Sequence, residues 1–259
     1  MIFVNLIKDK TPFNVYNNYN IYNPMEKYVN LKVADGTDME AYTAIPEGTA
    51  GKTSPGLILL QEAYGVNHHI RDMADRFAAQ GFVVIAPELY HRTAPPYFEG
   101  SYTNFEGVRS HGMAMTLEGN EADLKAAYHW LSHHELVNPE NIFSIGYCMG
   151  GRISFLANAT LPIKAGISYY SGYISKVADK AGSVNGRHLF FWGGLDQHIG
   201  QDQIDIITKA MDAAGKDYIN VKISYADHGF NCDERDSYNE NAAKEAWALT
   251  LAFFRNNVS

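Results

Sequence analysis

Residues 141–152 read Asn-Ile-Phe-Ser-Ile-Gly-Tyr-Cys-Met-Gly-Gly-Arg, and this stretch decides the fold. An apolar run rich in strand-forming residues leads into Gly-x-Cys-x-Gly, and a helical pattern follows at once. This order is typical of a nucleophile elbow, a sharp strand-to-helix turn that holds the nucleophile in a strained backbone conformation. Gly146 and Gly150 suit such a turn because a Cβ at either place would collide with neighbouring backbone. We therefore predict that Cys148 is a nucleophile; the alternative is a buried structural cysteine.

A cysteine stands where this motif usually carries serine. The helix that begins behind it points free N–H groups and partial positive charge at the sulfur, which favours the thiolate. The predicted chemistry is acyl transfer through a thioacyl-enzyme, which suits substrates with a good leaving group.

Length and composition narrow the class of protein. The 259 residues suit one large α/β domain, and 46% hydrophobic content excludes a disordered chain. A net charge of −8 argues against a nucleic-acid partner. The two cysteines, Cys148 and Cys232, have no metal-ligand spacing, which predicts a cytoplasmic protein without a disulfide framework or metal. No run approaches the ~18 apolar residues of a membrane span, and residues 1–7 lack the basic flank of a signal peptide.

The chain divides into a short extension and one domain. Residues 1–24 are rich in Asn and Tyr without helical or strand period, which predicts a poorly ordered extension or a covering strap. Residues 25–259 are expected to form a single domain. At its start, Tyr28–Val33 and Met39–Ala44 flank Asp35-Gly36 and predict an antiparallel hairpin.

Strand and helix patterns alternate through the rest of the chain. Strands are expected at 57–60, 82–87, 141–147, 163–170, 187–192 and 218–224, and helices at 68–80, 120–136 with Asn120 as N-cap, 199–215 and 242–255. Residues 88–117 show no clear period, as in a lid or binding loop. This alternation predicts a doubly wound, mostly parallel sheet, an α/β-hydrolase fold with an N-terminal hairpin.

Three candidate catalytic residues follow three strands of this sheet. Cys148, Asp196 and His228 occur in the chain order nucleophile, acid, histidine, which is that of the α/β-hydrolase triad. His228 would move the thiol proton, and Asp196 would orient the imidazole. Asp227 is the competing acid and is expected to face away. The alternatives are a surface-loop histidine and an aspartate that only shapes a turn.

The end of the first parallel strand supplies further candidates. The backbone N–H groups of Ala63 and Met149 are where an oxyanion hole would form. Glu62 would lie near the thiol, where its charge would favour the protonated sulfur until substrate displaces it; alternatively, it caps the next helix.

Substrate contacts are expected from aromatic residues and one arginine. Arg92 is suited to a bidentate grip on a substrate carboxylate, although a solvated loop charge is the alternative. Core packing accounts for most aromatics in a chain so rich in them, but some are expected to line an apolar pocket: Tyr64, Tyr90, Tyr170 and Trp192.

Together these segments resemble the dienelactone hydrolase (carboxymethylenebutenolidase) family. The resemblance covers the chain from about Met25 onward, and cysteine in place of serine is characteristic of that family. It is carried by five segments in order: Gln61–Asn67, Ala86–Arg92, Gly146–Gly151, Gly193–Asp196 and Asp227–Phe230. By resemblance, Cys148, Asp196 and His228 are the triad, Glu62 is the switch that activates the thiol, and Arg92 binds the substrate carboxylate.

The resemblance implies hydrolysis of an enol-lactone to an oxo acid without a cofactor. Well-known members carry a serine directly after the triad histidine and an arginine three residues further, where this chain has Gly229 and Cys232; Arg235 lies nearby in another register. The function predicted first is a cysteine hydrolase of a small lactone or activated ester, as monomer or homodimer. A broad carboxylesterase or thioesterase, a non-catalytic ligand-binding module and thiol redox sensing by Cys148 stay open. The adjacent pairs His68-His69 and His133-His134 cannot easily share a metal ion.

Overall fold

The structure, a computed structural model, describes residues 27–48 and 52–259. One eight-stranded sheet runs through them in the order β1-β2-β4-β3-β5-β6-β7-β8. Strands β3 to β8 are parallel, and β1 and β2 form an antiparallel hairpin that joins the sheet beside β4. The strands are β1 Tyr28–Lys32, β2 Asp38–Ala44, β3 Ser54–Leu60, β4 Val83–Pro87, β5 Val137–Tyr147, β6 Ala165–Tyr169, β7 Arg187–Gly193 and β8 Tyr218–Ile223.

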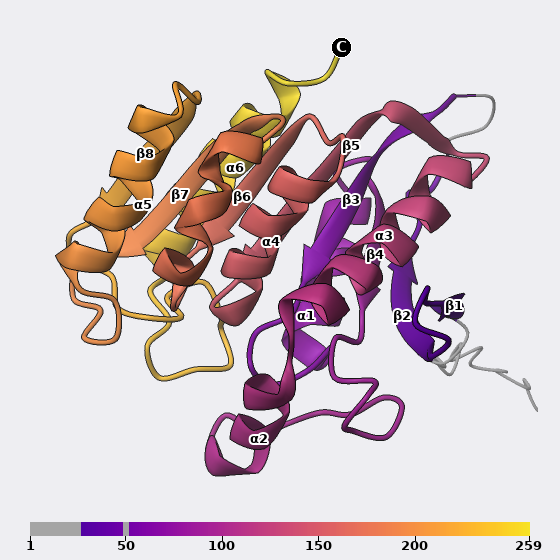
Figure 1. Cartoon of the computed structure of the whole chain (residues 1–259), viewed down its shortest axis with the longest axis horizontal. Coiled ribbons are helices and arrows are strands. Elements are labelled where there is room, and N and C mark those ends of the chain that lie inside the picture. Colours follow the sequence, from indigo (N-terminus) through magenta and orange to yellow (C-terminus); the bar gives the residue numbers. More distant parts are fainter. Residues whose placement is uncertain (1–26, 49–51) are drawn as a thin grey trace, which may run out of the picture.

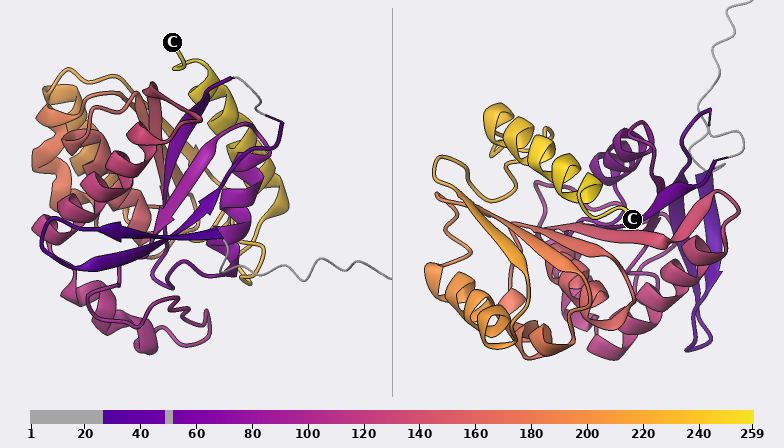
Figure 2. Two further views of the ribbon diagram at one scale, coloured as in Figure 1. Left: turned by 90° about the vertical axis from the view of Figure 1, so that its right-hand side faces the viewer. Right: turned by 90° about the horizontal axis from the view of Figure 1, so that it is seen from above.

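Helices cover both faces of the sheet (Figures 1 and 2). Helices α1 (His68–Ala78) and α6 (Glu240–Arg255) lie side by side on one face, where Phe77 packs on Trp247. The other face carries α3 (Leu117–His133), α4 (Met149–Thr160), α5 (Gln201–Ala213) and the 3₁₀ segment η2 (Ile174–Ser183). Because both faces are covered, the central strands are apolar throughout, and the side chains of residues 57–60 are fully buried. The predicted doubly wound sheet with its hairpin is confirmed.

The carboxyl ends of the parallel strands meet at one edge of the sheet. The segment that follows β4 crosses this edge and contains a helix that the sequence did not predict, α2 (Glu106–Ala114) (Figure 1). Val108 is the one buried residue of α2, so the helix lacks the wide apolar stripe by which amphipathic helices are recognised.

Helix α3 begins three residues earlier than predicted. Thr116, not Asn120, is its N-cap, and the Thr116 side chain accepts a hydrogen bond from the Gly119 amide at 3.0 Å. Thr and Asn are both common N-cap residues, and here Thr116 takes the place predicted for Asn120. The predicted extension over residues 1–24 lies outside the described residues. Within the described ranges, no helix is long and apolar enough to cross a membrane.

Candidate active site

Cys148 lies at the apex of a tight turn between β5 and α4. Its φ of 52° and ψ of −115° are unusual for a residue with a side chain. A Cβ on Gly146 would lie 2.0 Å from the Gly150 carbonyl oxygen, and one on Gly150 would lie 2.3 Å from the Leu60 oxygen. The two glycines therefore let the turn close against itself and against β3, as the elbow pattern predicted.

His228 and Asp196 converge on this turn from the loops after β8 and β7. Nδ1 of His228 lies 2.8 Å from Oδ2 of Asp196, whose side chain is almost fully buried. The imidazole also interacts electrostatically with the Cys148 side chain. Asp196 Oδ1 accepts the amides of His198 and Ile199, which fixes the carboxylate. His228 thus links Cys148 to Asp196.

Asp227 does not compete for the imidazole. Its Oδ1 accepts the backbone amide of His228 at 2.6 Å, so its carboxylate supports the loop instead of the ring. The expectation that Asp227 faces away from the ring agrees with this contact.

The electrostatics of the triad favour a charged imidazole. Burial lowers the pKa of His228, but the charge of Cys148 and the hydrogen bond to Asp196 outweigh it and raise the pKa to about 10. Burial acts to raise the pKa of Asp196, yet the hydrogen bond from His228 and the positive ring leave it lowered. The surroundings of His228 therefore favour a protonated imidazole that is held by the Asp196 carboxylate.

The residues that carry the two predicted oxyanion donors, Ala63 and Met149, both contact Tyr90. Met149 is the first residue of α4, so its N–H has no acceptor one turn earlier in the helix. Ala63 lies two residues after Gln61, and the Gln61 carbonyl packs against Gly150, the residue after Met149. A Cβ on Gly150 would lie 2.4 Å from the Gln61 oxygen. The hydroxyl of Tyr90 donates to the Ala63 carbonyl at 3.1 Å and lies 3.5 Å from the Met149 sulfur. Tyr90 therefore links the end of β3 to the start of α4.

Glu62 is fully buried and has two partners. The hydroxyl of Tyr102 donates to its Oε2 at 3.0 Å, and Nη1 of Arg235 lies 3.4 Å from its Oε1. Helix α1 is capped instead by Asn67, which removes the helix-cap alternative for Glu62. Glu62 is therefore held by a partly buried ion pair and a phenol.

Arg235 reaches this position because residue 229 is glycine. Gly229 has a φ of +79°, and a Cβ there would lie 2.5 Å from Nη1 of Arg235. The guanidinium also lies over the Tyr102 ring, 5.5 Å from its centroid. The absent side chain at 229 thus leaves the space that an arginine from another register fills.

Three of the four predicted aromatic residues surround the reacting groups. Tyr90 contacts Ala63 and Met149, as described above, and the Tyr170 ring packs against His228 at 5.2 Å. Tyr64 packs against Tyr102 at 4.5 Å and interacts electrostatically with Glu62 and Cys148. Tyr170 is fully buried, so it supports the His228 ring and its predicted substrate contact is corrected, whereas Tyr64 and Tyr90 keep a small exposed fraction beside the reacting groups.

Trp192 requires a correction. Its side chain is 1% exposed, stacks on Phe190 in the core, and donates Nε1–H to Asn220 on β8. Position 192 lies inside β7, so the residue near the strand end is a core residue and not part of a substrate pocket.

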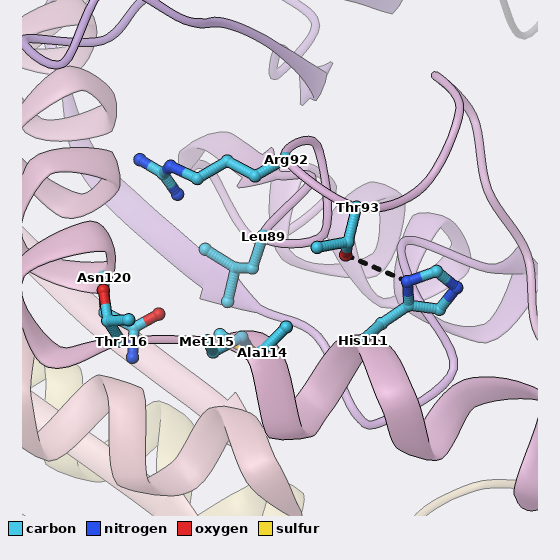
Figure 3. A pocket seen from close by; sticks show the side chains of 8 residues that line it. All are labelled: Leu89, Arg92, Thr93, His111, Ala114, Met115, Thr116 and Asn120. Carbon is cyan, nitrogen blue, oxygen red and sulfur yellow. Dashed lines mark hydrogen bonds between the residues drawn. The ribbon is translucent and has the colours of Figure 1, made fainter.

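Arg92 also requires a correction. Its guanidinium makes a bidentate contact with Asp123 at 2.8 and 2.9 Å, and Nε donates to Asp35. It borders a cavity of about 70 Å³ between the loop after β4, α2 and the start of α3, but extends toward α3 and away from His111 (Figure 3). Neither Cys148 nor His228 lines this cavity. Arg92 therefore anchors the segment after β4, and the substrate-carboxylate role is not supported by its contacts.

Tyr102 was not predicted from the sequence to be a site residue, and Arg235 was assigned no role in the site. Both come from irregular segments, where no strand end fixes a position. The one available signal for Arg235 was Gly229 directly after His228, because a glycine there leaves room beside the imidazole.

The fold is that of an α/β hydrolase. The sequence profile described as "Dienelactone hydrolase family" matches residues 39–258. Proteins named "Putative carboxymethylenebutenolidase" are similar: one from Salmonella typhimurium is 32% identical over 85% of this chain and 84% of its own length, and one from Synechocystis sp. is 33% identical over 79% and 87%. A crystal structure titled "Putative Dienelactone Hydrolase", from Klebsiella pneumoniae, superposes with a TM-score of 0.78 at 32% identity, over 88% of this chain and 98% of that one.

The chain belongs to the dienelactone hydrolase family. The predicted family, fold and class of enzyme, a hydrolase acting on ester bonds, are thereby confirmed.

Proposed function

We propose that this protein hydrolyses a small lactone or activated carboxylic ester through a thioacyl-enzyme on Cys148. The observation that carries the proposal is the convergence of Cys148, His228 and Asp196: the imidazole is held by the Asp196 carboxylate at 2.8 Å and interacts electrostatically with Cys148. With the proton already on the imidazole, the sulfur attacks the scissile carbonyl carbon and the carbonyl oxygen becomes negative. The amides of Ala63 and Met149 would then donate to this oxyanion, a contribution of about 3 to 4 kcal/mol per donor in comparable enzymes.

The same groups complete acylation and then hydrolyse the thioester. When the tetrahedral intermediate collapses, the C–O bond breaks and His228 gives its proton to the leaving oxygen, for which an enolate or phenolate is best suited. Neutral His228 then takes a proton from water, the hydroxide attacks the thioester, and the acid product leaves as the thiolate re-forms. Asp196 keeps the ring in the tautomer that both steps need. No cofactor enters this sequence.

Glu62 is proposed to modulate the sulfur through its charge. While Arg235 and Tyr102 offset the carboxylate, its repulsion of a nearby thiolate is weak; uncovering it would favour the protonated thiol. Consequently, Arg235→Gln should slow alkylation of Cys148 by iodoacetamide, and the additional change Glu62→Gln should restore the rate.

Hydrolysis of p-nitrophenyl acetate tests the proposed mechanism. Wild type should release p-nitrophenolate in a burst, and rapid quenching followed by mass spectrometry should place an acetyl group on the Cys148 peptide. Cys148→Ala should abolish turnover, and His228→Ala should lower it by a factor on the order of 10³ to 10⁴, the size typical of triad members.

His129→Ala is the matched control, because His129 is an exposed histidine on α3. It should leave the rate unchanged. Turnover that survives in Cys148→Ala would refute the thioacyl route, and absence of turnover across a panel of lactones, phenyl esters and thioesters would favour the ligand-binding alternative. Thioesters hydrolysed best would support a thioesterase.

A further inference from the structure

Helix α4, which begins with the proposed oxyanion donor Met149, is held on the sheet by a chain of buried hydrogen bonds. The hydroxyl of Ser168 on β6 donates to the Gly151 carbonyl at 2.7 Å, and its oxygen lies 2.8 Å from Nε2 of His188 on β7. Nδ1 of His188 lies 3.2 Å from the side-chain nitrogen of Asn158, which is again on α4. The chain of contacts therefore leaves the helix at Asn158 and returns to it at Gly151, about two turns earlier.

The donors and acceptors of this chain follow from its two ends. The Asn158 amide oxygen accepts the Gly186 N–H at 2.8 Å, so the amide nitrogen faces His188 as a donor. Nδ1 of His188 must then be unprotonated, and its Nε2–H donates to Ser168, whose own proton goes to Gly151. Burial lowers the pKa of His188 to about 3, so the ring is neutral near pH 7. Each hydrogen bond in the chain therefore points toward the first turn of α4.

Ser168 and His188 have the spacing of a nucleophile and its base, but they cannot form a second active site. Both side chains are fully buried, so no ester can reach the hydroxyl. The serine proton is also directed at a backbone carbonyl and not at the imidazole. Any role of this pair in the reaction must therefore come through the helix that it contacts.

Two contacts with the end of β6 fix the first turn of α4 at two points. The Cys148 amide donates to the Tyr169 carbonyl at 3.0 Å, and the Gly151 carbonyl accepts the Ser168 hydroxyl. Met149 lies between these two points. With only the first contact, the turn could tilt about Cys148, which would redirect the Met149 N–H while the sulfur stayed in place.

We propose that Ser168 and His188 are positioning residues that hold the Met149 amide in the direction that the oxyanion requires. The inference rests on the proposed function and adds two residues that do not touch the substrate. Hydrogen bonds suit this role because they are directional, whereas an apolar contact would let the helix slide along the sheet. A shift of about 1 Å in a reacting group can cost on the order of 10²-fold in rate.

Ser168→Ala is the first test, and Ser144→Ala is its matched control. Ser144 on β5 is also fully buried and donates to α4, but to the Ser154 carbonyl, at 3.2 Å. The two variants should lose similar amounts in thermal midpoint. Only Ser168→Ala should slow the p-nitrophenolate burst at saturating p-nitrophenyl acetate, by about tenfold to a hundredfold. The ester concentration that gives half the maximal burst rate should not change.

Alkylation of Cys148 by iodoacetamide separates the amide from the sulfur, because this reaction displaces iodide and forms no oxyanion. Its rate should be unchanged in Ser168→Ala. Equal slowing of alkylation and of the burst would show an effect on the thiolate and would overturn the proposal. An unchanged burst in Ser168→Ala, or equal slowing in both serine variants, would show that the contact is only structural and would overturn it as well.

Two substitutions at His188 keep the test decisive if Ser168→Ala does not fold. Glutamine can present a side-chain N–H near the place of Nε2–H, whereas methionine cannot. His188→Met should therefore slow the burst, and His188→Gln should retain most of the wild-type rate. Equal loss of rate in both variants would contradict the proposed hydrogen-bond chain.

Addition of trifluoroacetone to Cys148 distinguishes failure of this inference from failure of the proposed function. The thiolate sulfur bonds to the carbonyl carbon and the oxygen becomes negative, so fluorine NMR detects the adduct without any hydrolysis. Ser168→Ala should weaken the adduct about tenfold or more, and Ser144→Ala should not. If wild type forms the adduct but hydrolyses no ester, the hydrolase mechanism fails and this comparison alone decides the positioning role. A wild type that forms no adduct would lack the oxyanion site, and the inference would fail with it.

Discussion

The elbow region and the segment after β4 meet at the same edge of the sheet but are held in different ways. Around Cys148, backbone packs on backbone so closely that Gly146 and Gly150 leave no room for a methyl group. The segment of residues 88–116 is fixed by isolated polar anchors: Arg92 on Asp123, Glu88 on Tyr97, and Tyr102 on Glu62. Steric closure holds Cys148, whereas separate polar contacts hold residues 88–116. The effects of substitutions on the free energy of unfolding should therefore differ between the two regions in size and in pH dependence.

The largest effect is expected in the elbow. Gly150→Ala would place a Cβ 2.3 Å from the Leu60 oxygen and 2.4 Å from the Gln61 oxygen, both of them backbone atoms that cannot move aside. We expect a loss of more than about 4 kcal/mol in the free energy of unfolding, or failure to fold. Urea denaturation measures it. Gly182→Ala is the control, because a Cβ there meets no atom within 4 Å, and it should stay close to wild type.

The same contrast explains how much the sequence could reveal. At the elbow, residues close in the sequence are also the ones in contact. The turn requires glycine two residues before and two residues after Cys148, so the motif is visible in the sequence. Asp196 and His228 were predictable because parallel strands end at one edge. Arg92 and Trp192 were misplaced for the opposite reason. The partner of Arg92 is Asp123, 31 residues away on α3, and no local pattern announces a pairing of that kind.

Breaking the Asp123 anchor should have the second largest effect. Asp123 is fully buried and accepts both Arg92 and His91, so Asp123→Asn would leave two donors facing a neutral amide. A loss of about 2 to 4 kcal/mol in the free energy of unfolding is expected, toward the lower end because Arg92 is 29% exposed. Chemical denaturation of single and double variants with Arg92→Gln would give the coupling energy between the two residues.

Arg92→Gln also tests whether Arg92 binds a substrate carboxylate. The variant should destabilise the protein. It should leave unchanged the ratio of the rates at which iodoacetate, which carries a carboxylate, and iodoacetamide, which does not, alkylate Cys148. A selective loss of reaction with anionic reagents in this variant would return Arg92 to the substrate-binding role that its contacts argue against.

Tyr102 connects the two regions, and its loss should be smaller. Tyr102→Phe removes one donor from Glu62 but leaves Arg235 in place, so a cost of about 1 to 2 kcal/mol in the free energy of unfolding is expected. With less to offset the Glu62 charge, alkylation of Cys148 by iodoacetamide should also slow. Tyr128→Phe, a tyrosine on α3, is the matched control for loss of a hydroxyl. Equal effects from both variants would remove Tyr102 from the description of the site.

The smallest effect is expected at Glu88, and it should depend on pH. Burial raises the pKa of Glu88 to about 7, although both of its oxygens lie within hydrogen-bond reach of the Tyr97 amide. The groups that face it are Glu40 on β2, Arg71 on α1, and Glu99, and the two carboxylates add to the rise. A folded-state pKa above the unfolded value means that the folded protein binds the proton more tightly. The stabilising contribution is therefore full below about pH 4.5 and is lost as pH rises through 7.

Glu88→Gln isolates this contribution, since glutamine keeps an acceptor for Tyr97 but never ionises. At pH 8 the variant should be more stable than wild type by about 1 kcal/mol, and at pH 4.5 the difference should vanish or reverse. Thermal midpoints recorded across this range at constant ionic strength measure it. A constant offset between the two proteins at every pH would mean that Glu88 does not titrate in this window, and that the segment after β4 is held as independently of pH as the elbow.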